Sequence, residues 1–176
     1  MENWKNLTSN ILMGLSLIAV GLNTAIDNQI VFAKSTQPQK CNIYGYVNTA
    51  NTQNLNIRNF ASSNSKIIAQ IPANETVQII AALNEWAKIT NSSSGFKGSG
   101  WVSLSKLGIS TTGYGTKGVN IYANTNLKSR KLGLIPPNTN LKLIDCQGEW
   151  AKVQYQNLKG WLAKPDQCGA ALTSCS

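Results

Sequence analysis

Residues 55–89, LNIRNFASSNSKIIAQIPANETVQIIAALNEWAKI, decide the fold because the chain uses their pattern twice. After 64 positions it returns as residues 119–153, VNIYANTNLKSRKLGLIPPNTNLKLIDCQGEWAKV. The longest identical run is Glu85-Trp86-Ala87-Lys88, repeated as Glu149-Trp150-Ala151-Lys152. Self-similarity at a fixed spacing predicts one supersecondary unit built twice.

The spacing between the copies changes after Ile89. From there it is 60 residues, so that Gly100-Trp101 corresponds to Gly160-Trp161. The first copy carries four more residues in the polar stretch 91–99. A length change in a Ser- and Gly-rich tract between apolar segments is typical of a surface loop.

Each copy consists of short β-favouring runs separated by clusters of Asn, Ser, Thr, Gly and Pro. No window of eleven or more residues beyond residue 33 keeps a helical apolar period, so the sequence predicts an all-β fold. About five short strands per copy can bury one face and lose their open edges by closing into a small barrel. The expected strands are 43–47, 55–58, 66–71, 76–82, 86–90 and 100–104, then 119–122, 129–135, 140–146, 150–155 and 160–162.

The expected domain organisation follows from these runs. Residues 34–40 are a polar, flexible lead-in, residues 41–108 form the first domain, and residues 109–176 form the second, which has a cysteine-bearing C-terminal end. The segment 108–118 holds four glycines and is expected to connect the barrels. We also expect this segment to form the first strand and loop of the second barrel.

The N-terminus is typical of a secretory signal peptide. Lys5 precedes an uncharged apolar run of twelve residues, 11–22, and Val31-Phe32-Ala33 provides a cleavage site, with Ala25 a competing one. An uncleaved membrane anchor is the alternative, but a helix needs about 20 apolar residues to cross a bilayer. We therefore expect residues 1–33 to be removed and the protein to be exported to the periplasm, the cell envelope or the medium.

Four cysteines, Cys41, Cys146, Cys168 and Cys175, lie beyond the signal peptide. An even number in an exported chain indicates two disulfides, with three possible pairings. The positions favour Cys146 with Cys168 and Cys41 with Cys175. A zinc site is the alternative, but the chain has no histidine and no short cysteine spacing.

Residues 34–176 contain 15 basic and 5 acidic side chains, a formal charge of +10. A scattered excess of this kind can serve solubility alone. The functional alternative is attraction to an anionic envelope polymer rather than to nucleic acid.

The chain offers little for catalysis. Without histidine, and with cysteines expected to be oxidised, it lacks a nucleophile paired with a base, and neither a metal nor a cofactor is expected. Glu85 and Glu149 occupy equivalent turns, which favours a local role over a paired acid and base. We therefore expect a protein that is not an enzyme.

The ordered motifs resemble the bacterial SH3 (SH3b-type) domain. The family pattern of a Leu-Asn-Val-Arg start, a Leu-Pro-x-Gly turn, a strand-opening Trp and a closing Gly-Trp-Val has counterparts in both copies. In the first they are Leu55-Asn-Ile57-Arg58, Ile71-Pro72-Ala73-Asn74, Trp86-Ala-Lys88-Ile89 and Gly100-Trp101-Val102. In the second they are Val119-Asn-Ile121, Ile135-Pro136-Pro137-Asn138, Trp150-Ala-Lys152-Val153 and Gly160-Trp161-Leu162. Such a tandem is similar to exported SH3-like proteins of cyanobacteria.

Two departures from the family pattern stand out. Tyr122 replaces the arginine found at Arg58, and Asn74 and Asn138 replace the turn glycine. Asn is the residue other than Gly that most readily adopts positive φ, so the turns are expected to persist.

The resemblance implies two tandem SH3-like barrels that hold peptidoglycan or another envelope polymer or peptide, as related domains do in cell-wall hydrolases. The alternative is a structural adaptor that docks another exported protein through a strand edge. Trp86 and Trp150 are expected to pack in the core. The candidate ligand-binding residues are Trp101, Trp161, Tyr44, Tyr46, Arg58 and Tyr122.

Overall fold

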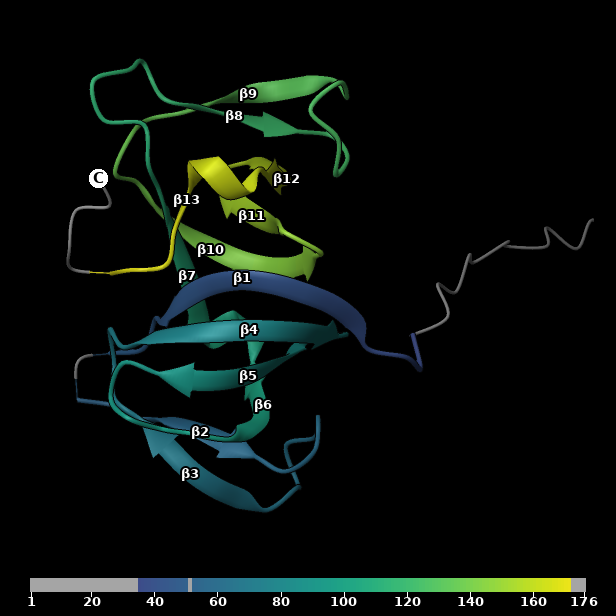
Figure 1. The fold of residues 1–176 in the computed structure, drawn as a ribbon, viewed down its shortest axis with the longest axis vertical. Coiled ribbons are helices and arrows are strands. Elements are labelled where there is room, and N and C mark those ends of the chain that lie inside the picture. Colours follow the sequence, from purple (N-terminus) through teal and green to yellow (C-terminus); the bar gives the residue numbers. More distant parts are fainter. Residues whose placement is uncertain (1–34, 51, 172–176) are drawn as a thin grey trace, which may run out of the picture. The chain divides into compact units, whose positions relative to one another are not determined.

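The computed structural model describes residues 35–50 and 52–171. The expected signal peptide and Cys175 therefore lie outside the described residues. No helix within the described ranges has the length and apolarity needed to span a bilayer. Apart from two single-turn 3-10 helices, the regular elements of these described ranges are strands, so the prediction of an all-β fold is confirmed (Figure 1).

The first repeat contains six strands and a 3-10 turn. They are β1 Gln39–Val47, β2 Leu55–Arg58, β3 Ile67–Ile71, β4 Thr76–Leu83, β5 Trp86–Ser92, β6 Ser99–Ser103 and η1 Leu104–Lys106. The second repeat has the same series: β7 Leu107–Thr111, β8 Val119–Tyr122, β9 Lys131–Ile135, β10 Asn140–Gln147, β11 Trp150–Tyr155, β12 Leu158–Leu162 and η2 Lys164–Asp166, followed by β13 Gln167–Cys168. β1 includes the last two residues of the expected lead-in.

Both repeats pair their strands in the same antiparallel pattern. In the first repeat β1 pairs with β4, β4 with β5, β5 with β6, β6 with β2, and β2 with β3. In the second, β7, β10, β11, β12, β8 and β9 follow in the same order. The sequence repeat is therefore a repeat of strand topology.

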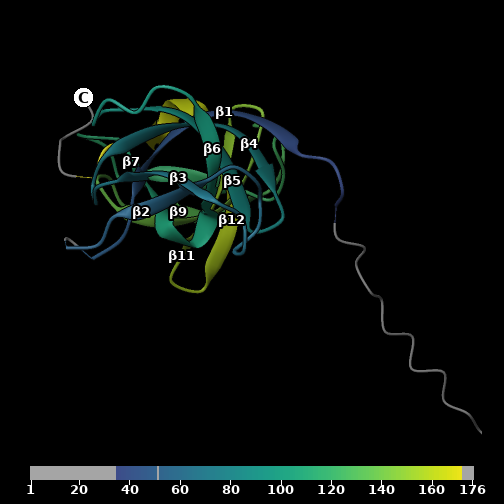
Figure 2. The same ribbon diagram turned by 90° about the horizontal axis from the view of Figure 1, so that it is seen from below.

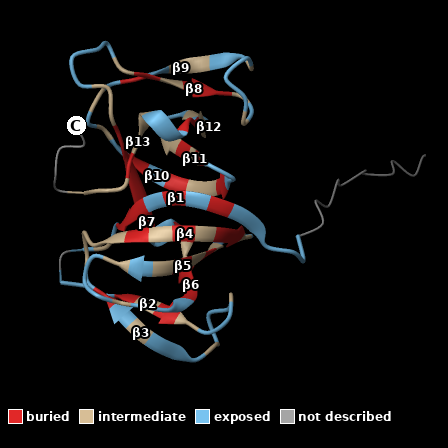
Figure 3. Cartoon of the chain, in the orientation of Figure 1, coloured by how far each residue is buried: buried red, intermediate tan, exposed pale blue. Residues whose placement is uncertain are grey.

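β7 belongs to both repeats. After η1 it returns to β1, with Tyr46 opposite Gly108, and it then pairs with β10 as the first strand of the second repeat. β13 returns to β7 after η2 in the same way. Every residue of β7 is buried, as Figure 3 shows. Figure 1 shows β1 and β7 midway between the two sets of strands, and in Figure 2 the two sets lie one behind the other.

The ladders do not close into two rings as expected. Hydrogen-bonded strands form one open path from β3 through β1 and β7 to β9. β3 and β9 are its two ends. Closure is incomplete because β7 lies between β1 and β10, which joins the two sheets through their first strands.

A single hydrophobic core runs through both repeats, and strand alternation fills it. In β5 the inward residues Ala87 and Ile89 are fully buried, whereas Trp86 and Lys88 lie outward and are partly exposed. Trp150 likewise lies outward in β11. The expectation that Trp86 and Trp150 pack in the core is wrong, because the Ala and Ile positions of the same strand occupy the inner face.

The turn residues behave as predicted. Asn74 and Asn138 have φ of 66° and 52°, which confirms that Asn replaces the turn glycine with positive φ. Gly100 and Gly160 allow β6 and β12 to approach their neighbours closely. A Cβ on Gly160 would lie 2.7 Å from the carbonyl oxygen of Tyr122.

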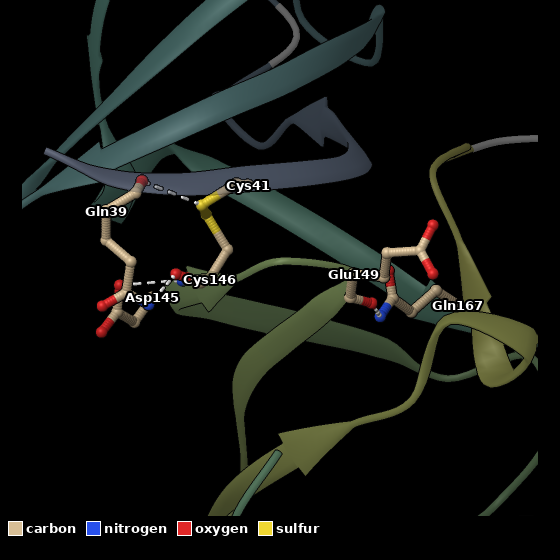
Figure 4. Close-up of a disulfide and its surroundings, with 6 residues drawn as sticks. All are labelled: Gln39, Cys41, Asp145, Cys146, Glu149 and Gln167. Carbon is tan, nitrogen blue, oxygen red and sulfur yellow. Dashed lines mark hydrogen bonds between the residues drawn. A yellow bond between two sulfur atoms is a disulfide. The ribbon is translucent and has the colours of Figure 1, made fainter. Parts of the chain in front are cut away.

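The disulfide joins Cys41 to Cys146, with an S–S distance of 2.05 Å, so the expected pairings of Cys146 with Cys168 and Cys41 with Cys175 are wrong. The physical reason is that β1 runs beside the β10–β11 turn: Asn42 N donates to Gly148 O at 2.6 Å, and Gly148 N donates to Lys40 O at 2.9 Å. Gln39 Nε2 also donates to Cys146 O at 2.6 Å (Figure 4). Cys168 is disulfide-bonded as well. The Cys41–Cys146 bridge therefore connects the two repeats.

Candidate functional site

A hollow of 220 Å³ opens on the outer face of the first repeat, between the loop before β2 and the sheet β2–β6–β5. We call it the Arg58 hollow; the lining residues used below are Arg58, Lys106, Trp86, Gln53, Asn56 and Ser103. Strand alternation explains its floor, because Asn56 and Arg58 lie outward on β2 while Leu55 and Ile57 point into the core.

The hollow has a positive charge. Arg58 and Lys106 line it, and no acidic side chain does so within the described part of the chain. Arg58 Nη1 donates to Ser65 O at 2.6 Å, which fixes one end of the guanidinium. The ion pair found among the described residues joins Lys164 to Glu149, so neither cation of the hollow is neutralised by a neighbouring carboxylate.

Backbone hydrogen bonds hold the walls of the hollow together. Asn48 N donates to Lys106 O at 2.8 Å, which ties the loop before β2 to η1. Leu104 N donates to Glu85 O at 2.9 Å, which ties η1 to the turn before Trp86. Thr49 Oγ1 donates to Gln53 O at 2.6 Å inside the loop. The hollow is therefore formed before any ligand arrives.

The equivalent place in the second repeat has different chemistry. Tyr122 stands at the position of Arg58 and Asp166 at that of Lys106. The Tyr122 ring is 6% exposed and meets the Trp150 ring edge-on, with centroids 5.7 Å apart. Burial raises the pKa of the Asp166 carboxyl above its ordinary value. An aromatic contact and an acid thus replace the two cations.

Trp101 and Trp161 lie on the same outer faces of the two repeats as Arg58 and Tyr122. Trp101 is opposite Arg58 and Lys88, and is 9% exposed. Trp161 is opposite Tyr122, and Lys152 Nζ lies 5.4 Å from the centre of its ring. The structure therefore brings Arg58 together with Trp101, and Tyr122 together with Trp161, in separate repeats.

The bacterial SH3 domain family matches residues 53–107 and 117–166, which together make up more than half of the chain. The chain belongs to the bacterial SH3 domain family. Its two SH3 domains correspond to the two repeats. No curated protein sequence matches the chain.

Two solved structures are similar to the tandem SH3 chain. NlpC2 from Trichomonas vaginalis has 16% sequence identity and a TM-score of 0.32, over 72% of this chain and 48% of that one. NlpC1 from Trichomonas vaginalis has 18% identity and a TM-score of 0.32, over 78% of this chain and 49% of that one. The chain thus spans about half the length of each.

Of the six candidate binding residues, Arg58 alone lines the Arg58 hollow; the other five are Trp101, Trp161, Tyr122, Tyr44 and Tyr46. Tyr46 is buried, and its ring covers Gly108, where a Cβ would lie 2.5 Å from the ring. Burial raises the pKa of the Tyr46 hydroxyl. Tyr44 is 51% exposed and lines a separate hollow of 160 Å³ with Lys164 and Gly169. β1 therefore does not contribute to the Arg58 hollow.

Five residues that line the hollow were not among the predicted binding residues: Trp86, Lys106, Gln53, Asn56 and Ser103. Trp86 could have been found from the alternation Trp86-Ala87-Lys88-Ile89, which places the tryptophan on the same outer face as Lys88. No local sequence pattern indicates Lys106, because its place in the hollow depends on η1 packing beside the loop before β2.

The acidic side chains are dispersed. Glu85 is exposed in the β4–β5 turn, and Glu149 pairs with Lys164 and lies 3.5 Å from Asn42 Nδ2. No group of three metal-ligating side chains occurs in residues 35–50 and 52–171. The arrangement at the Arg58 hollow is suited to holding a ligand by charge, hydrogen bonds and an aromatic surface.

Proposed function

We propose that this protein is an exported, non-catalytic binding protein that recognises a cell-envelope polymer or peptide, such as peptidoglycan or an anionic glycan, through its SH3 domains. The observation that carries the proposal is the Arg58 hollow, a pre-formed site with two unpaired cations and one partly exposed tryptophan. The formal charge of +10 on residues 34–176 supports attraction to a negatively charged polymer.

A pull-down on purified peptidoglycan and on an anionic polysaccharide tests this proposal. We expect the protein to sediment with the polymer at low salt and to be released as salt rises, because screening weakens the attraction of exposed charges. Protein that remains in the supernatant at low salt with every polymer would contradict the proposal. A zymogram of the same wall preparation is expected to stay free of clearing.

A second candidate function, docking of another exported protein, is favoured by the open edges of the sheet. β3 and β9 each have one paired side, and Ile67, Ile68 and Leu134 are exposed there by 44%, 44% and 49%. Unpaired strand edges can accept an added strand. Failure of the polymer pull-down together with capture of one envelope protein, lost when Ile68 is changed to Lys, would favour this function.

Export is part of the proposal and has its own test. The intact mass of the protein recovered from outside the cytoplasm is expected to correspond to cleavage near Ala33. Recovery of full-length protein in the cytoplasmic fraction would contradict export.

A further inference from the structure

We propose that the Arg58 hollow binds a single acidic sugar unit of a longer polymer, with the carboxylate at Arg58 and Lys106 and the sugar ring against Trp86. This inference rests on the proposed function and specifies its ligand class. It also assigns ligand binding to the first SH3 domain and a supporting role to the second.

The charges of the hollow select an anion. The Arg58 guanidinium donates one N–H group to Ser65 O, and its remaining N–H groups can donate to a ligand. Because the guanidinium is planar, two of its N–H groups can bind the two oxygens of one carboxylate. Lys106 is exposed on η1, lines the same hollow and adds a second positive charge. With no acidic side chain among the described lining residues, a cationic or neutral ligand would leave both charges unmatched.

The remaining lining residues suit a sugar rather than a simple ion. Trp86 supplies an apolar aromatic surface for the C–H face of a pyranose ring, and its exposure is intermediate, so that part of the ring is accessible. Gln53, Asn56 and Ser103 supply amide and hydroxyl groups that can donate to and accept from sugar hydroxyls. Asn56 Oδ1 already accepts from Gln70 Nε2 at 2.7 Å, which orients its own amide donor.

The size of the hollow sets the length of the bound segment. Its 220 Å³ is below the roughly 300–1,000 Å³ of pockets that enclose drug-sized ligands. It therefore accommodates one unit, while the rest of the polymer continues outside the hollow.

The second SH3 domain provides an internal comparison. It keeps the tryptophan as Trp150 and the asparagine as Asn120, but the two cations are replaced by Tyr122 and Asp166, and Ser103 by Ala163. Tyr122 packs against Trp150, which removes part of the aromatic surface from solvent. The two cations that would hold a carboxylate are thus missing from the equivalent place in the second domain.

Calorimetric titration of the purified protein with tetragalacturonate, and with neutral cellotetraose, tests the inference. We expect binding of the uronate that weakens with salt, and no binding of the neutral sugar. Arg58→Gln is expected to weaken uronate binding by about tenfold or more, since it removes a hydrogen bond to a charged group. Lys106→Gln, an exposed cation, should cost about two- to fivefold.

Matched controls separate local from general effects. Lys128→Gln is the control for Lys106→Gln, because it removes one positive charge from an exposed loop outside the hollow. Tyr114→Ala is the control for Trp86→Ala, because it removes an aromatic ring that lies outside the hollow and is 46% exposed. Both controls are expected to bind the uronate as the unchanged protein does. Since Arg58 also contacts Ser65 O, Lys106→Gln and Trp86→Ala keep the test decisive if Arg58→Gln fails to fold.

Several results would overturn the inference. Equal binding of cellotetraose would remove the need for the carboxylate, and tighter binding of an acetylated dipeptide with a free carboxylate would replace the sugar by a peptide. Peptidoglycan pull-down that persists unchanged in Lys106→Gln and Trp86→Ala would reject this site but leave the proposed function intact. Loss of all polymer binding by the unchanged protein would instead reject the proposed function.

Discussion

At the scale of single residues, the two SH3 domains differ at the place where ligand binding is proposed. Arg58 and Tyr122 occupy equivalent ends of β2 and β8, and both lie opposite a tryptophan of the neighbouring strand. Arg58 leaves a charged hollow, whereas Tyr122 fills its place against Trp150. Together with Asp166 in place of Lys106, this substitution removes both cations of the hollow from the second domain, and we therefore propose that the first domain binds the ligand.

Asp145 gives the first prediction at this scale. Partial burial raises the pKa of its carboxyl above the ordinary value of 3.8, against the smaller opposing effects of the Cys146 N–H group and Lys152. An acid with a raised folded-state pKa favours the protonated form, so its contribution to stability is present below pH 3.8 and is lost as pH rises through the folded-state pKa. Asp145→Asn stays neutral and can still accept from Cys146 N.

We therefore expect Asp145→Asn to match the unchanged protein in stability near pH 3 and to exceed it at pH 7. Urea unfolding of both proteins at several pH values measures the difference. A difference that stays constant with pH, or that favours the unchanged protein at pH 7, would contradict this reading of the carboxyl.

At the scale of elements, β7 determines how the two domains are joined. It pairs with β1, β10 and β13, and it is buried along its length. A strand that is the last of one domain and the first of the next does not act as a flexible linker. Both domains therefore depend on the same strand for their stability.

Ile109→Ala tests the dependence of both domains on β7. Ile109 is fully buried, and truncating a buried Ile costs about 2–5 kcal/mol. We expect amide hydrogen exchange to accelerate in β5 and in β11 alike. Leu134→Ala, on an exposed position of β9, should change stability by about 0.5 kcal/mol or less. Faster exchange in β11 alone would show that the domains unfold independently.

Local sequence patterns predict the strands well, but they do not predict which elements meet in the fold. The bounds of β2, β8 and β11 agree with the expected runs 55–58, 119–122 and 150–155, because apolar alternation ends there at turn residues. The sequence predicts Trp86 in the core because a tryptophan that opens a strand usually packs there, whereas Ala87 and Ile89 occupy the inner face of β5. The Arg58 hollow depends on η1 meeting the loop before β2, which no local pattern encodes.

At the scale of the whole described molecule, the disulfide reinforces the joint between the domains. Cys41 and Cys146 are 105 positions apart in sequence and lie in different repeats. The sequence favoured other pairings because cysteine positions alone do not show that β1 passes beside the β10–β11 turn. Since β1 and β7 also pair directly, the covalent link adds to an existing contact.

Removal of this link by Cys41→Ala with Cys146→Ala is expected to lower the free energy of unfolding by about 2–4 kcal/mol. The strand signal in circular dichroism should persist, because the ladder between β1 and β7 remains. Urea unfolding under oxidising conditions, compared with the unchanged protein, measures the loss. An unchanged midpoint would show that the bridge does not constrain the unfolded chain.

We propose above that this tandem SH3 protein binds an anionic envelope polymer at the Arg58 hollow, and NMR tests this directly. Residues 34–176 contain four tryptophans, Trp86, Trp101, Trp150 and Trp161, so indole N–H signals in NMR distinguish the two domains. We predict that solubilised peptidoglycan fragments or oligogalacturonate shift the Trp86 signal, and that Lys106→Gln weakens this response. Shifts confined to Trp150 and Trp161, or no shift with either ligand, would contradict the claim.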